Sequence, residues 1–79
     1  MKTTLDKLKI GNSAKIIKVN NNGSIRRRLL DIGLIPGSIV TSYLESPFKD
    51  PIAYKIKNAV IAIRKNDSKE IEVDTIWDE

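Results

Sequence analysis

The chain has 79 residues and a formal net charge of +4, which is enough for one small hydrophobic core. It contains no cysteine and no histidine, which excludes disulfides, thiolate metal sites, thiol nucleophiles and the usual neutral-pH proton shuttle. No stretch approaches the ~20 apolar residues of a membrane span, and Met1–Ile10 lacks the apolar run of a signal peptide. We therefore expect one soluble, cytoplasmic domain over residues 1–79, with an acidic tail at residues 74–79.

The first half of the chain predicts a strand followed by a short helix. Ala14–Val19 is rich in β-branched residues and runs into three asparagines and a glycine, as a strand entering a turn does. Ser24 is a good N-cap residue, and Gly33 follows Ile32 as a glycine follows a helix end. The sequence therefore predicts a helix of about two turns.

The apolar residues of this helix predict how it packs. Successive helical positions differ by about 100° in direction, so Ile25, Leu29 and Ile32 share one face and Leu30 lies round the side. A helix this short is stable only when such a face packs against other elements.

The second half predicts strands with one helical turn. Apolar and polar residues alternate over residues 39–44 and 52–56, an apolar run fills residues 59–63, and residues 70–73 alternate again. We expect residues 52–56 and 59–63 to form a hairpin in which Asn58 takes a positive φ, and residues 66–69 to form a helical turn. Five short strands with one small helix indicate an all-β fold, a strongly bent sheet forming a small SH3-like barrel.

Three adjacent arginines, Arg26, Arg27 and Arg28, suggest an anionic partner. Consecutive helical residues point in different directions, so the three guanidinium groups should fan around the helix. A solvated helix face, contact with a protein and contact with nucleic acid all remain open. The charge distribution is compatible with contact with an acidic protein or with nucleic acid, because residues 1–40 carry +6 and residues 41–79 carry −2.

The connection after the helix is the most distinctive local feature. Leu34 and Ile35 are adjacent large aliphatic residues between Gly33 and the turn-forming Pro36 and Gly37. Both side chains cannot easily point inward from a connection, so at least one caps the barrel or stands exposed as a docking anchor. On the docking interpretation, Leu34→Asp should abolish association and leave the fold cooperative.

The acidic and aromatic residues offer little chemistry. Glu70, Glu72 and Asp74 alternate with apolar residues, so we interpret them, with Asp67, as solvated residues and predict neither a metal site nor a catalytic carboxylate pair. Tyr43 and Tyr54 are expected in the core, and Trp77 is expected over a barrel opening.

Several segments resemble the ferrous iron transport protein A (FeoA) family: TLDKLKIG, RRRLLDIGLIPGSIV, SPFKDPIAYKIKNAVIAIRK and EIEV. They follow one another in the family's order over nearly the whole chain. Leu29, Gly33, Leu34, Pro36 and Gly37 match the family's central motif, and Asp50, Pro51 and Ile52 match its second. The chain departs from the family at Asn58 and Ala59, where a glycine and an aromatic residue are common.

The resemblance implies a non-catalytic accessory protein without a cofactor, which contacts the cytoplasmic GTPase portion of a ferrous iron transporter. Because His and Cys are absent, we predict that the chain does not itself hold Fe²⁺ tightly. No membrane insertion is expected, and weak self-association is left open. The alternative is a small basic barrel that binds nucleic acid. The predicted partner contacts are Arg26, Arg27, Leu30, Leu34, Ile35 and Pro36, and the predicted structural residues are Gly33, Gly37, Asp50 and Pro51.

Overall fold

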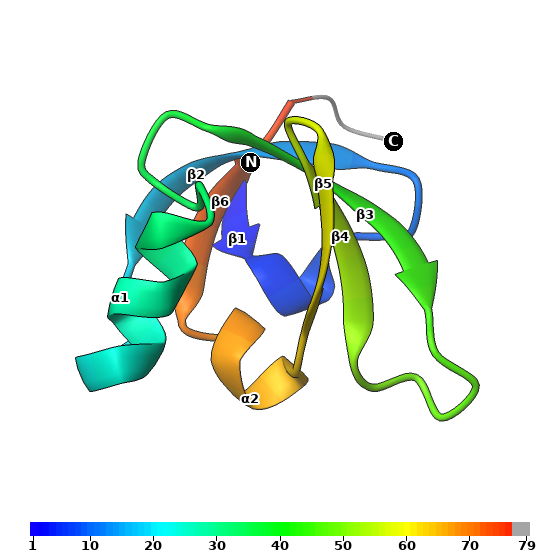
Figure 1. Ribbon diagram of the computed structural model, residues 1–79. Coiled ribbons are helices and arrows are strands. Elements are labelled where there is room, and N and C mark those ends of the chain that lie inside the picture. Colours follow the sequence, from blue (N-terminus) through cyan, green and yellow to red (C-terminus); the bar gives the residue numbers. More distant parts are fainter. Residues whose placement is uncertain (77–79) are drawn as a thin grey trace.

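Figure 1 shows the computed structural model, which describes residues 1–76. The elements in chain order are β1 Lys2–Thr4, η1 Leu5–Lys7 (a 3-10 helix), β2 Ser13–Val19, α1 Gly23–Asp31, β3 Ile39–Glu45, β4 Ile52–Ile56, β5 Ala59–Ile63, α2 Lys65–Ser68 and β6 Ile71–Thr75. The predicted all-β class with one short main helix is confirmed. The expected position of Trp77 lies outside the described residues.

The strands form one antiparallel sheet in the order β1-β6-β2-β3-β4-β5. Figure 1 shows that this sheet bends strongly around the interior. The sequence predicts five of these strands and misses β1, which is too short to show alternation and pairs Thr3 with Val73 of β6. The order makes β1 and β5 the two ends of the sheet, so β5 is an edge strand.

The core is aliphatic, with one buried tyrosine at its centre. Leu5 of η1 and Tyr54 of β4 are both fully buried, and the Tyr54 hydroxyl donates a hydrogen bond to the Leu5 carbonyl oxygen over 3.3 Å. This bond ties the N-terminal segment to β4. Burial raises the pKa of the Tyr54 hydroxyl above its usual value.

Tyr43 is not a core residue, which corrects the prediction from alternation. Val40 and Ser42 are the buried residues of β3, so Tyr43 lies in the opposite phase of the strand, with Ile39 and Thr41. It is 46% exposed, with the Lys55 ammonium 5.7 Å from its ring centroid. Both phases of this strand carry apolar residues, so alternation alone does not identify the buried one.

The predicted N-cap of α1 is also wrong. The helix starts at Gly23, and its N-cap is Asn22, whose side chain makes no capping hydrogen bond to any described residue. Ser24 therefore lies inside the first turn. The helix depends on packing for its position, as its short length requires.

The C-terminal end of α1 is closed by a Schellman motif. Gly33 has a φ of +108°, and its N–H donates to the Leu30 carbonyl oxygen over 3.1 Å. The Leu34 N–H reaches back to the Leu29 carbonyl oxygen over 3.0 Å. The motif brings the residue after the glycine onto the last turn of the helix, and both Leu29 and Leu34 belong to the core.

We expect Gly33→Ala to destabilise the fold by about 1–2 kcal/mol, because an L-residue is strained in this backbone region. The cost is conformational, since a Cβ at Gly33 would meet only the Ile56 Cδ1 atom at 3.8 Å. Urea unfolding monitored by circular dichroism measures the change. An unchanged midpoint would show that the cap contributes nothing.

The turn after α1 is fixed to β2. The Ser38 N–H donates to the Ile35 carbonyl oxygen over 3.0 Å, with Pro36 second in the turn and Gly37 third at a φ of +96°. The Gly37 N–H also donates to the Ile16 carbonyl oxygen over 2.8 Å. Gly33 and Gly37 therefore occupy positions where the backbone favours glycine.

The hairpin between β4 and β5 is present, with its positive φ at a different residue from the one predicted. Lys57 has a φ of +53°, and Asn58 does not share it. The turn has only these two residues, so Ile56 lies directly opposite Ala59. This register determines which backbone groups of β5 point towards β4.

Asp74 and Thr75 belong to β6, which corrects the predicted tail over residues 74–79. Asp74 pairs with Lys2 of β1 and Lys15 of β2 in the register. Its Oδ1 atom accepts a hydrogen bond from the Met1 amine over 2.9 Å, and this bond lowers the pKa of the Asp74 carboxyl. The N-terminus is thus fastened to the last strand.

Candidate functional site

An apolar groove runs between α1 and the edge strand β5. Its volume is about 630 Å³. The lining comes from the helix, the β5 end of the hairpin and the segments beside it: Ile25, Arg28, Leu29, Ile32, Pro51, Ile61, Ala62, Ile63, Arg64 and Asp67. The helix contributes the face that the 3.6-residue period predicts, but that face is only partly used for the core.

The residues that line this groove differ in how much of each side chain is exposed: those at the bottom are buried, and those at the rim are accessible. Leu29 is buried in the core, whereas Ile25 is 39% exposed and Ile32 is similarly accessible. Across the groove, Ile61 is half-buried against the core and Ala62 is exposed. Accessible aliphatic side chains on two facing elements are typical of a surface that another molecule covers.

The charges around the groove favour the binding of an acidic segment. Arg28 and Arg64 line it from opposite elements, and Asp67 is the acidic residue among the lining side chains. All three belong to segments that flank the apolar strip. An acidic side chain on a docked segment could therefore meet an arginine on either side.

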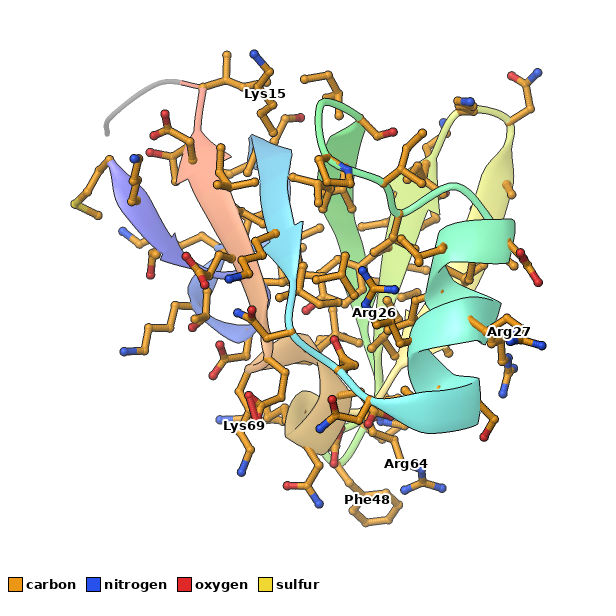
Figure 2. All side chains as sticks on the ribbon, turned by 90° about the vertical axis from the view of Figure 1, so that its left-hand side faces the viewer. Lys15, Arg26, Arg27, Phe48, Arg64 and Lys69 are labelled. Carbon is orange, nitrogen blue, oxygen red and sulfur yellow. The ribbon has the colours of Figure 1, made fainter. Side chains whose placement is uncertain are left out.

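Arg26, Arg27 and Leu30 lie together, but away from the groove. They line a separate shallow depression of about 260 Å³ with Gly23 and Asp31. Figure 2 shows Arg26 and Arg27 leaving α1 in different directions, as the fan of consecutive helical residues requires. Their role as partner contacts stays a prediction.

Leu34 cannot be a docking anchor, which corrects a predicted contact. It is 0% exposed, because the Schellman motif places it against Leu29 in the core. Of the two adjacent aliphatics, Ile35 is the outward one, at 43% exposed, and Pro36 beside it is exposed as well. Neither Ile35 nor Pro36 lines the groove.

Asp50 and Pro51 connect the β3–β4 loop to α2. The Asp50 Oδ1 atom accepts a hydrogen bond from the Lys65 N–H over 2.9 Å, at the first residue of α2. The Pro51 carbonyl oxygen accepts from the Ser46 N–H over 3.3 Å, and Pro51 also lines the groove. Asp50 thus satisfies a helix-end donor and fixes one end of the groove.

Two further findings concern the described residues only. Within residues 1–76, no three acidic side chains come close enough to form a metal site. In the same part of the chain, no helix has the length and apolarity needed to cross a membrane.

Sequence reasoning missed half of the groove. The helical period predicts the face of Ile25, Leu29 and Ile32, but it indicates only packing for that face. Nothing in the local sequence indicated that Ala62 and Arg64 would lie opposite that face. The sequence does contain one relevant feature, the uncharged run at residues 59–63. A strand at the end of a sheet usually carries charged residues, so this run is consistent with a strand that another molecule covers.

Nearly the whole chain is similar to known iron transport proteins. Residues 3–75 match the FeoA domain. A relative from Porphyromonas gingivalis, described as an Fe(2+) transport protein A/Fe(2+) transporter FeoB fusion protein, is 33% identical over 72 residues. This match covers 91% of the chain and 8% of the relative, so the chain spans only a small part of the fusion protein.

Solved structures show the same likeness. The FeoA protein of Chlorobium tepidum is 31% identical with a TM-score of 0.91, over 98% of this chain and 74% of that one. The FeoA of Stenotrophomonas maltophilia, solved with zinc and described as a prokaryotic SH3 domain protein, is 28% identical with a TM-score of 0.82, over 91% and 89%. These likenesses confirm the predicted SH3-like barrel. The chain is therefore a member of the FeoA family, the ferrous iron transport accessory proteins.

Proposed function

We propose that the chain is a non-catalytic accessory protein of ferrous iron uptake that binds and regulates the cytoplasmic GTPase portion of the ferrous iron transporter. The observation that carries this proposal is the fusion relative, in which a segment similar to this chain is joined to FeoB. Joining two proteins in one chain raises their effective concentration for each other, an advantage when they must associate.

The groove between α1 and β5 is the surface that best supports such binding. It has exposed aliphatic residues at its rim, cations on both sides and a volume of about 630 Å³. A small protein with most of its apolar residues committed to the core acts on a partner through its surface. A bound partner would bury the exposed surfaces of Ile25 and Ile32.

Calorimetric titration of the purified chain into the GTPase portion of the transporter tests the proposal. We expect saturable binding with one chain per GTPase portion at physiological salt and an altered rate of GTP hydrolysis in the same mixture. Absence of binding at concentrations up to the millimolar range would reject it, and binding without a rate change would reject the regulatory part.

A duplex DNA oligonucleotide, titrated in parallel, distinguishes the alternative partner. Binding to DNA that falls steeply with salt, together with no binding to the GTPase portion, would replace the proposal with a nucleic-acid function. Under the proposal, DNA binds far more weakly than the GTPase portion at physiological salt.

A further inference from the structure

We propose that the groove accepts an extended acidic and aliphatic segment of the partner, which adds to the sheet as a new strand along the open edge of β5. The inference deepens the proposed function and rests on it. Its basis is the backbone of β5 rather than the groove's side chains alone.

The hairpin register shows which backbone groups of β5 are free. In an antiparallel ladder, hydrogen-bonded and non-hydrogen-bonded pairs alternate, and a two-residue turn closes on a hydrogen-bonded pair. Because Ile56 opposes Ala59, the next bonded pair is Tyr54 with Ile61. Val60 and Ala62 belong to the intervening non-bonded pairs, so their N–H and C=O groups point away from β4, towards the open edge.

These outward groups have no partner within residues 1–76. Apart from the ladder to β4, none of the backbone hydrogen bonds of the described residues reaches β5, and none of their side-chain bonds does. Val60 is 52% exposed and Ala62, which lines the groove, is exposed too. The free donors and acceptors therefore lie beside the apolar surface that an added strand would cover.

The edge also lacks the features that usually prevent strand addition. Ala59–Ile63 contains no charge, no proline and no bulge, whereas the opposite edge, β1, is three residues long and carries Lys2. A five-residue strand offers about 17 Å of edge. This length is sufficient for the main-chain pairing that peptide-binding sheets use.

The chemistry of the occupant follows from the two walls. Alternate side chains of an added strand would face Ile25 and Ile32 of α1, which favours aliphatic residues at those positions. Arg28 and Arg64 favour carboxylates at either end. A second copy of the chain is a less suitable occupant, because it carries the same net charge of +4 and would meet the groove's arginines with a basic surface overall.

Amide hydrogen exchange of the chain with and without the GTPase portion of the transporter tests the inference. We expect the Val60 and Ala62 amides to exchange at least tenfold more slowly at saturation. The Ile61 amide, already paired with β4, should change by less than threefold and is the internal control. Unchanged exchange at Val60 and Ala62 in a saturated complex would overturn strand addition and leave the proposed function intact.

A substitution provides an independent test. Ala62→Pro removes the outward N–H without removing a bond to β4, and we expect it to weaken binding to the GTPase portion at least tenfold. Ala62→Thr keeps the N–H and should therefore lose much less affinity than Ala62→Pro. If Ala62→Pro loses its cooperative thermal transition, the exchange measurement on the wild-type chain decides instead. Equal binding by a folded Ala62→Pro variant would overturn the inference.

Analytical ultracentrifugation of the chain alone tests whether a second copy of the chain occupies the β5 edge. We expect a monomer at concentrations where the GTPase portion saturates it. A dimer in which the Val60 and Ala62 amides are already protected would assign the edge to a second copy and overturn the inference. Failure of the wild-type chain to bind the GTPase portion at all would instead reject the proposed function.

Discussion

Ile25→Asp is expected to weaken binding to the transporter's GTPase portion by at least tenfold while leaving the fold intact. Ile25 lines the groove and lies in the first turn of α1. A carboxylate there replaces an aliphatic contact with a charge that the docked segment would have to desolvate. The same carboxylate interacts favourably with the helix N-terminus, so the free energy of unfolding should change by less than about 1 kcal/mol.

Ile35→Asp is the matched control for this variant. The two isoleucines are almost equally exposed, at 39% and 43%, but only Ile25 lines the groove. Calorimetric titration of both variants at one salt concentration separates a local effect from a general effect of added negative charge. Equal losses for Ile25→Asp and Ile35→Asp, or a larger loss for Ile35→Asp, would place the interface outside the groove.

Leu34→Asp is expected to unfold the protein, not to remove a contact selectively. The side chain is fully buried in the core, and a lone carboxylate there would have no cationic partner. A core of this size supplies only about 3–5 kcal/mol, and Leu→Ala alone costs about 2–5 kcal/mol at buried sites. The variant should therefore show no cooperative thermal transition and little native far-ultraviolet circular dichroism at 25 °C.

Ile35→Asp again provides the comparison, because it places the same charge one residue further along the turn. It should keep a cooperative transition close to that of the wild type. A folded Leu34→Asp variant would mean that the connection can turn this side chain outwards, and the docking interpretation of Leu34 would then return.

The end of α1 illustrates what the sequence can and cannot reveal. Gly33 is predictable as a helix stop, because the requirement for a positive φ is local and only glycine meets it cheaply. The same cap determines which of Leu34 and Ile35 turns inwards, because the residue after the glycine is brought onto the last turn of the helix at Leu29. Adjacent aliphatics alone predict one buried and one exposed residue, whereas the Schellman motif identifies Leu34 as the buried one.

The groove depends on contacts between distant segments, which the sequence does not reveal. One wall follows from the period of α1, which places Ile25 and Ile32 on one face. The other wall exists because the sheet order puts β5 at an end and leaves Ala62 beside that face. The apolar run at residues 59–63 predicts β5 itself but does not say whether this strand has one neighbour or two.

The arginine run likewise does not reveal which cations share a surface. Three adjacent cations attract notice in the sequence, yet the helix divides them between two surfaces, with Arg28 on the groove and Arg26 and Arg27 on the other depression. Arg64, which lines the groove from the far side, lies outside this run and is followed by Lys65. The charge that a partner meets is thus set by the fold and not by the run.

The central claim is that the chain acts on its partner through the groove between α1 and β5. Heteronuclear NMR spectra of the labelled chain, recorded as unlabelled GTPase portion of the transporter is added, test it most directly. The account predicts that the largest amide shift changes cluster at Ile25, Ile32, Val60 and Ala62. Changes centred on β1 and the outer face of β6, with the groove unaffected in a saturated complex, would contradict it.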